Sequence, residues 1–295
     1  MASLQQLTQA EQEGFARLNR YGVTADPAEL ARAAEIWRWV AQETSDPGQR
    51  SLVWAAISVA MRRYFEATSE LWALRDAVEC GRAAVRTETV PHRWLSACIY
   101  LGYADYTYFK ATRERPYLDD ALAVLRTACA AEAGIPTRSN VLSHLGAALT
   151  VAWETLNKEA FLTEAVTVGR EAVRLPGQLQ LNSALDLIRN LRSLGGAHQD
   201  IGLLRESEAL ARWAQGTPDD GFRGLALFEL ARTLDSIAER VNEPGIRADA
   251  VAAGEASVAL ARDPVEHRLR SIVISGIQHR FLRSSPPPEP PLPPT

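Results

Sequence analysis

The sequence has 295 residues and a mass of 32.4 kDa, with 46% apolar residues, 23% charged residues and a formal net charge of −4. This composition excludes a chain that is disordered throughout, and the negative charge argues against a protein that coats nucleic acid. Three cysteines without close spacing, Cys80, Cys98 and Cys129, exclude a disulfide framework and a cysteine-rich zinc site.

The N-terminal segment, residues 1–22, lacks the basic region and apolar run of a signal peptide. No stretch reaches the length of about 18 uninterrupted apolar residues that a transmembrane helix needs. We therefore expect a cytoplasmic protein with reduced thiols.

The prolines are the most informative residues for the fold. Six of the 16 form a regular series, with separations of 44, 45, 40, 42 and 46 residues: Pro47, Pro91, Pro136, Pro176, Pro218 and Pro264. Proline inside a helix costs roughly 3 kcal/mol, so it collects at helix boundaries. The series therefore predicts helix breaks that recur about every 44 residues, as in a repeat protein.

Other residue types follow the same period. Four units match without an insertion in a leucine column, an alanine column, an arginine column, an aromatic column and a small-residue column. These columns are Leu30, Leu74, Leu118, Leu162; Ala33, Ala77, Ala121, Ala165; Arg38, Arg82, Arg126, Arg170; Tyr21, Phe65, Phe109, Trp153; and Gly14, Ser58, Gly102, Gly146. A fifth unit follows at a spacing of 42, and a sixth matches more weakly near the end of the array.

Each unit contains two helical patterns. In the fourth unit, Leu142, Leu145 and Leu149 are spaced by three and four residues, and a second such stripe begins at Leu162 and Ala165. One hairpin cannot bury both of its apolar faces, whereas stacked hairpins can. The sequence predicts an all-α solenoid of about six antiparallel helical hairpins over residues 1–262.

The C-terminal part divides into a helix and a tail. Residues 263–283 predict a capping helix whose apolar side faces the array and whose outer face is polar. Its apolar positions are Leu269, Ile272, Val273, Ile277 and Phe281. Seven prolines fall within residues 284–295, which predicts a disordered polyproline tail that acts as a linker or as a ligand for a proline-recognising domain.

These motifs resemble the tetratricopeptide repeat over roughly residues 5–262. The resemblance rests on the pairs Leu101-Gly102 and Leu145-Gly146, on an early alanine in each second helix, and on the closing prolines Pro136 and Pro176. The period of about 44 residues is longer than the usual 34. The long form is similar to repeats beside caspase-like CHAT peptidase domains of actinobacterial and fungal proteins. The resemblance implies a right-handed superhelix that binds peptides or protein segments on its concave side.

The resemblance also implies which side chains line that concave groove. Projected from the Leu-Gly pairs, the candidate ligand-binding residues are Arg62, Arg63, Tyr103, Tyr106, Ser143, Arg189, Arg192 and Arg232. Arginine pairs bidentately with carboxylates, and tyrosine offers flat contact area at a low entropic cost. We therefore expect an acidic peptide, or one held by its terminal carboxylate, as the ligand.

Catalytic chemistry and metal or cofactor binding are not indicated. The histidines are dispersed without metal-ligand spacing, and Gly195-Gly196 is interpreted as a turn between helices rather than a phosphate loop. The seven tryptophans are interpreted as core and inter-repeat packing rather than a stacking surface for nucleic acid.

The sequence thus predicts a non-enzymatic scaffold or sensor that binds a protein or peptide, without nucleic acid, membrane, metal or cofactor as partner. Two alternatives stay open. One is the regulatory repeat region of a CHAT-type peptidase system. The other is a helical-repeat enzyme or small-molecule binder whose central cavity is lined by Tyr103, Tyr106 and His144. The sequence does not decide whether the chain forms a homo-oligomer.

Overall fold

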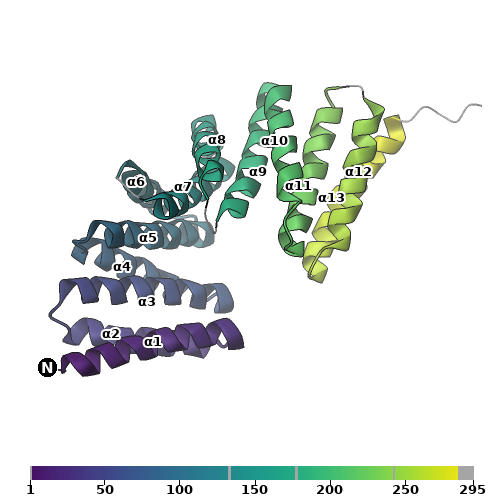
Figure 1. Cartoon of the computed structure of the whole chain (residues 1–295). Helices are drawn as coiled ribbons and strands as arrows, with labels where there is room; N and C mark the ends of the chain where they lie inside the picture. Colours follow the sequence, from purple (N-terminus) through teal and green to yellow (C-terminus); the bar gives the residue numbers. More distant parts are fainter. Residues whose placement is uncertain (1, 132–133, 177–178, 242, 285–295) are drawn as a thin grey trace, which may run out of the picture. The chain divides into compact units, whose positions relative to one another are not determined.

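The fold was analysed in a computed structural model that describes residues 2–131, 134–176, 179–241 and 243–284. Within these ranges there are thirteen α-helices and no strand (Figure 1). The helices are α1 (Leu4–Thr24), α2 (Pro27–Glu43), α3 (Pro47–Thr68), α4 (Leu71–Thr87), α5 (Pro91–Thr112), α6 (Arg115–Ala130), α7 (Ile135–Leu156), α8 (Glu159–Arg174), α9 (Gln180–His198), α10 (Ile201–Ala214), α11 (Asp220–Ala238), α12 (Pro244–Ala259) and α13 (Pro264–Ser284).

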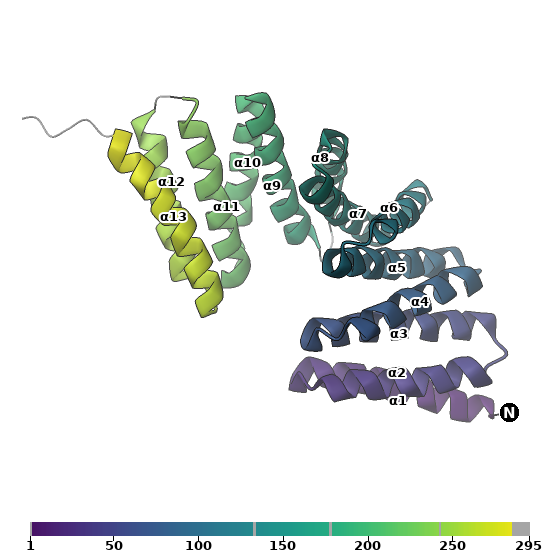
Figure 2. The same ribbon diagram turned by 180° about the vertical axis from the view of Figure 1, so that it is seen from behind.

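The chain forms two compact units, and the division between them falls within α8. Unit 1 comprises residues 1–164 and 174–179, and unit 2 comprises residues 165–173 and 180–295. In unit 1, α1, α3 and α5 form one layer and α2, α4 and α6 the other (Figures 1 and 2). In unit 2, α11 contacts both α9 and α13, α10 packs against α9 and α11, and α12 packs against α11 and α13. The predicted all-α solenoid of six hairpins followed by a capping helix is confirmed.

Prolines begin or precede the helices, as the spacing predicts. Pro47, Pro91 and Pro264 are the first residues of α3, α5 and α13, and Pro136 is the second residue of α7. Pro218 lies just before Asp219, whose carboxylate caps α11 by accepting from the amide of Gly221 at 2.8 Å. These positions suit proline because the first amides of a helix have no intrahelical acceptor.

The turn inside each of the first five hairpins has the same left-handed backbone. The residues with positive φ are Ala25, Ser69, Arg113, Asn157 and Gln199, with φ between 50° and 64°. In the first four of these turns the amide donates to the carbonyl of the aromatic column, for example from Ser69 to Phe65 at 2.7 Å. The aromatic column therefore marks the end of each first helix, although no glycine signals the turn.

The repeat columns have distinct packing roles. All residues of the leucine and alanine columns are at most 1% exposed. In the small-residue column, a Cβ added to Gly102 of α5 would lie 2.6 Å from Cγ of Leu125 of α6, and one added to Gly14 of α1 would lie 2.2 Å from Nε1 of Trp37 of α2. The small residues thus allow the two helices of a hairpin to approach closely.

The arginine column connects one hairpin with the next. Arg38 pairs with Asp76, Arg82 with Asp120 at 2.8 Å, and Arg126 with Glu164 at 2.6 Å. In unit 2, Arg170 pairs with Glu206 at 2.5 Å. Each pair joins the second helix of one hairpin to the second helix of the following hairpin. We call this series the arginine ladder.

Three predictions from the sequence are wrong in detail. Gly195 and Gly196 lie within α9, which ends at His198, so they do not form the turn. Trp39, Trp72 and Trp213 are 40–52% exposed, so not all tryptophans pack in the core. The outer face of α13 is not polar, because Leu269 and Ile272 are exposed, while Ile274, Ile277 and Arg270 face inward. The structure does not describe the side chain of Phe281 or residues 285–295. The predictions for them therefore lie outside the described residues. The predicted domain boundaries stay predictions.

Substituting a glycine at a close helix contact tests the packing. Gly102→Ala should lower the free energy of unfolding by about 1–3 kcal/mol, because the added methyl group overlaps Leu125. Urea denaturation measures this change. The matched control is Gly22→Ala in α1, where nothing lies within 4 Å of the added Cβ, and where the better helix propensity of alanine should stabilise the chain by up to about 1 kcal/mol. A stabilising Gly102→Ala would contradict close approach at this position.

Candidate functional site

The predicted ligand-binding residues of unit 1 form a cluster on α3, α5 and α7. The guanidinium of Arg62 lies 3.9 Å from the centre of the Tyr103 ring. Tyr103 stacks on Tyr106 with 5.1 Å between ring centres, and its ring centre is 4.9 Å from that of His144. We call these four residues the tyrosine cluster. They come together because α3 contacts α5 and α5 contacts α7 along one layer of unit 1.

Most of the tyrosine cluster is closed to solvent. Arg62, Tyr106 and the neighbouring Ser143 are each 7–9% exposed, whereas Tyr103 and Arg63 are half-buried. Burial, assisted by the charge of Arg62, lowers the pKa of His144 to about 4, so its imidazole is neutral near pH 7. Arg62 also pairs with Glu66 of its own helix. The cluster therefore works first as packing between three helices, and it offers a ligand mainly Tyr103 and Arg63.

The predicted residues of unit 2 surround one buried carboxylate. Glu229 of α11 is 2% exposed and accepts from Arg189 and Arg192 of α9, each at 2.9 Å. Arg232 of α11 lies 3.6 Å from the same carboxylate, and Arg189 also pairs with Asp186 at 3.4 Å. We call Arg189, Arg192, Arg232 and Glu229 the arginine cluster. The sequence analysis identified the three arginines but not Glu229. An acidic residue 40 residues after Arg189, close to one repeat, could have indicated it.

The arginine cluster contains a donor that could bind an anion. Three guanidinium groups gather around the carboxylate of Glu229, and Arg189 also contacts Asp186. The Nε of Arg192 is buried and has no hydrogen-bond partner among the described residues. Burial also lowers the pKa of Arg192, against the opposing effect of Glu229. A carboxylate that reached this guanidinium would supply the missing acceptor.

The core of unit 1 contains an ionisable residue that the sequence reasoning did not single out. Asp105 of α5 is fully buried, and neither carboxylate oxygen has a hydrogen-bond partner among the described residues. At the 44-residue period its counterparts are Met61 and Leu149, both at most 1% exposed. Burial raises the pKa of Asp105 to about 7, against the opposing effect of Arg82, whose guanidinium lies 3.5 Å away. A carboxylic acid thus occupies a position that is apolar in neighbouring repeats.

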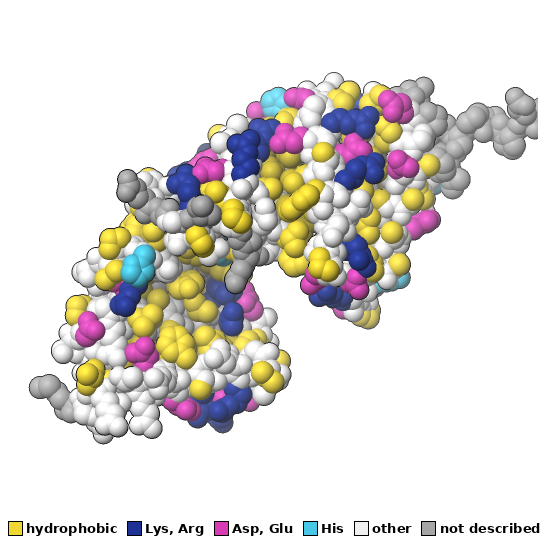
Figure 3. Space-filling model, viewed as in Figure 1, with side chains coloured by type: hydrophobic (Ala, Val, Ile, Leu, Met, Phe, Trp, Pro, Cys, Tyr) yellow, Lys and Arg dark blue, Asp and Glu magenta, His cyan; other side chains and the backbone are white. Residues whose placement is uncertain are grey.

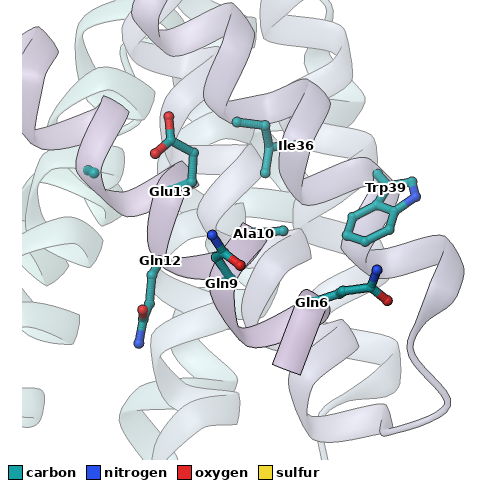
Figure 4. Close-up of a pocket in the computed structure, with 8 residues that line it drawn as sticks. Gln6, Gln9, Ala10, Gln12, Glu13, Ile36 and Trp39 are labelled. Atoms are coloured by element: carbon teal, nitrogen blue, oxygen red, sulfur yellow. The ribbon is translucent and has the colours of Figure 1, made fainter. Parts of the chain in front are cut away.

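A pocket of about 740 Å³ opens between α1 and α2. Its lining includes Gln6, Gln9 and Glu13 of α1 and Ile36 and Trp39 of α2 (Figure 4). One period later, Gln9 and Glu13 correspond to Val53 and Ile57, which are buried in the core with residues of α2. On α1 these positions carry polar side chains, whereas on α3 the equivalent positions are apolar and buried.

Other features of the described residues concern a metal centre, a reactive thiol, basic patches and membrane-spanning helices. No group of three or more His, Cys, Asp and Glu residues in the described ranges is placed to hold a metal ion. Burial raises the pKa of the Cys98 thiol to about 12, which suppresses its thiolate form. On the face shown in Figure 3, Lys and Arg side chains mostly lie beside Asp and Glu rather than in one basic field. None of the described helices combines the length and apolar character needed to cross a bilayer.

Comparison with known proteins gives structural neighbours only. No family profile and no curated protein matches the chain. Solved structures similar to it include the nuclear import adaptor Nro1 of S. pombe, with 12% identity, a TM-score of 0.46 and coverage of 97% of this chain and 96% of that one. A putative kinesin light chain of Podospora anserina with nearly identical TPR-like repeats has 16% identity, a TM-score of 0.49 and coverage of 74% and 100%. Since these scores are below 0.5, the solenoid assignment depends on the packing of this chain's own helices.

Replacing Asp105 tests its ionisation in the core. The carboxyl has a higher pKa in the folded chain than in the unfolded chain, so the stability it contributes is lost as the pH rises from about 4 to about 7. Asp105→Leu should therefore raise the free energy of unfolding at pH 8 by on the order of 2–4 kcal/mol, and by less at pH 4.5. Urea denaturation at both values measures the difference.

The control for this prediction is Asp119→Leu, which removes an exposed carboxylate paired with Arg115 on α6. It should change stability by less than about 1 kcal/mol at either pH. A lower free energy of unfolding for Asp105→Leu at pH 8 would contradict the prediction, because it would show that the fold stabilises the carboxylate.

Proposed function

We propose that this chain is a non-enzymatic scaffold that binds a protein or peptide along the layers formed by the first helices of its hairpins. The stacked hairpins support this because they present side chains from successive helices on one continuous surface within each unit. Such a surface suits an extended partner segment better than a small molecule, since it is built from many shallow positions.

The arginine cluster of unit 2 carries the more specific part of the proposal. The unpartnered Nε of Arg192 and the three guanidinium groups around Glu229 favour a ligand with a carboxylate. Phe228 lies one helical turn before Arg232, with 5.6 Å between the guanidinium and the ring centre, and adds aromatic contact area beside the charge. The proposed ligand is an acidic peptide segment. Tyr103 and Arg63 of unit 1 are a separate candidate contact.

Two finer predictions remain to be tested. A role as the regulatory repeat region of a CHAT-type peptidase system would be supported by a peptidase gene next to this one or continuous with it. A small-molecule site at Tyr103, Tyr106 and His144 would require ligand to reach side chains that are mostly buried against one another.

Peptide binding after removal of two arginines tests the proposal. The probes are fluorescein-labelled acidic peptides from an array, each paired with its Glu→Gln and Asp→Asn version. Arg189→Ala/Arg232→Ala should weaken binding of the acidic peptides at least tenfold, because two of the three cations are lost. The double variant keeps the buried pair between Arg192 and Glu229, which should preserve the fold.

The matched control is Arg126→Ala/Arg170→Ala, which removes the same charge from the arginine ladder on the second helices. Its affinity for the acidic peptides should stay within twofold of that of the unaltered chain. Equal losses in both variants would indicate unspecific attraction, and unchanged affinity in Arg189→Ala/Arg232→Ala would remove the arginine cluster from the binding surface.

A further inference from the structure

Three arginines surround one buried carboxylate at the turn of the first hairpin. Glu29 of α2 is 6% exposed. It accepts from Arg17 and Arg20 of α1, each at 3.3 Å, and from Arg32 of its own helix at 3.1 Å. Arg20 and Arg32 contact different oxygens of this carboxylate, and their side chains are 51% and 58% exposed. We call Arg20 and Arg32 the first-hairpin arginine pair, which can reach a ligand from both helices.

The first-hairpin arginine pair continues the two walls of the pocket between α1 and α2 (Figure 4). The α1 residues that line the pocket run from Gln6 to Ala16, and those of α2 run from Trp39 to Ile36. Arg20 follows Ala16 by four residues, and Arg32 precedes Ile36 by four, so each lies one turn further on the same helix face. The distance from Gln6 to Arg20 is about 21 Å along the helix. We call the pocket and this arginine pair together the first-hairpin groove.

The same face of the second hairpin is covered by a helix. One period after Gln9 and Glu13 of the pocket come Val53 and Ile57 of α3, which are fully buried. Both belong to a core cluster with residues of α2, because α2 packs along α3. The first-hairpin groove is therefore the place at which, one repeat later, a helix is docked.

The charge at this place is inverted in the first hairpin. At the later junctions a carboxylate of the second helix receives the ladder arginine of the preceding hairpin. Asp76 of α4 pairs with Arg38 of α2, and Asp120 of α6 pairs in the same way with Arg82 of α4 at 2.8 Å. One period before Asp76 the residue is Arg32. A helix that docks on the first-hairpin groove must therefore bring a carboxylate, where α2 brings an arginine to α4.

The rest of the first-hairpin groove suits the apolar face of such a helix. Trp39 is 40% exposed and, with Ile36, offers apolar contact area on α2. Gln9 on α1 carries an uncharged amide that can donate and accept hydrogen bonds. Glu13 also lines the groove, and its carboxylate pairs with Arg17 at 2.9 Å. The groove thus combines an apolar middle with a basic end.

A second copy of the chain matches this groove less well than an acidic partner does. One exposed apolar face of the chain lies on α13, where Leu269 and Ile272 are 61% and 62% exposed. His267 and Arg268 are exposed next to Leu269 and would bring basic side chains to a basic site. Since like charges that face each other across an interface oppose association, the charge favours a separate acidic partner.

We propose that the first-hairpin groove binds an acidic amphipathic helix of a partner protein. A carboxylate of that helix pairs with Arg20 and Arg32, and its apolar side chains pack on Ile36 and Trp39. The partner helix lies along α1 as α2 lies along α3, and it extends the stack of unit 1 by one helix. The site shares no residue with the arginine cluster of unit 2, so the two can be tested separately.

Titration of the full chain with stapled helical peptides tests this site. The probes are two hydrocarbon-stapled helices of about 18 residues, or about 27 Å, with the same leucine stripe flanked by glutamate or by lysine. Fluorescence anisotropy should show that the glutamate helix binds at least tenfold more tightly than the lysine helix. Arg20→Ala/Arg32→Ala should weaken binding of the glutamate helix at least tenfold. This variant keeps the pair between Arg17 and Glu29, which should preserve the fold.

Three further variants locate the binding. Arg86→Ala/Arg115→Ala removes the same charge from α4 and α6, at arginines that reach solvent, and should keep the affinity within twofold. Ala16→Trp fills the groove without a change of charge and should weaken binding at least tenfold. Arg189→Ala/Arg232→Ala should leave the affinity for the glutamate helix within twofold, so that this result is distinct from the test of the arginine cluster.

The outcomes separate the possible occupants. Losses in Arg20→Ala/Arg32→Ala and Ala16→Trp, without a loss in the other two variants, support the proposal. It is overturned if the glutamate helix does not bind, or binds the arginine variant unchanged. Unchanged binding by Ala16→Trp would overturn docking in the groove in favour of surface attraction. Equal binding of an unstapled, proline-interrupted glutamate peptide would replace the helix with an extended segment. Dimers in analytical ultracentrifugation that the glutamate helix dissociates would replace it with a second copy.

Discussion

The close approach of the two helices in a hairpin is the constraint on which each stack depends. At Gly14 and Gly102 there is no room for even a methyl group, because Trp37 and Leu125 of the paired helix fill the space. This contact brings the apolar stripes of both helices together and leaves the outer faces of the hairpin to be covered by its neighbours. Two helices and their turns take up about 44 residues. The period of the sequence is therefore the length of one closely packed hairpin.

Two buried carboxyl groups, Glu229 and Asp105, differ in how well nearby arginines stabilise their charge. Glu229 is buried but paired with arginines from two helices, so its charge is stabilised where it lies. Asp105 is buried beside Arg82, and Arg82 is shared with Asp120 of the arginine ladder. The first arrangement gathers three guanidinium groups around one carboxylate in unit 2. The second leaves a carboxyl group that exchanges its proton near neutral pH in the middle of unit 1.

Much of the fold follows from the sequence because its signals are local and repeated. Proline excludes itself from helix interiors, so six regularly spaced prolines located the hairpins, and the leucine and alanine columns located the core. The rotation of α13 could not be predicted in this way. Both of its sides carry apolar residues, and the choice between them is made by Ile274, Ile277 and the hydrogen bonds of the buried Arg270.

The candidate site was less predictable than the fold. The projection from the Leu-Gly pairs correctly placed Tyr103 next to Tyr106. It also grouped Arg189, Arg192 and Arg232, which lie together in the structure. Their burial and their partners depend on side chains from neighbouring repeats, such as Glu66 and Glu229, which a projection of one helix at a time does not include. The turn residues Ala25 and Arg113 show a similar limit, since both have positive φ although neither is a glycine.

The arginine ladder has a consequence for how such a chain can change in evolution. Each rung joins an arginine of one hairpin to a carboxylate of the next, and every hairpin that is joined on both sides carries one of each. Deleting or duplicating a whole 44-residue unit brings an arginine opposite an equivalent carboxylate again, and the new junction keeps its ion pair. Gaining or losing only one helix would separate the partners. The ladder therefore makes the hairpin the unit of exchange, so the array can alter its length while each junction remains matched.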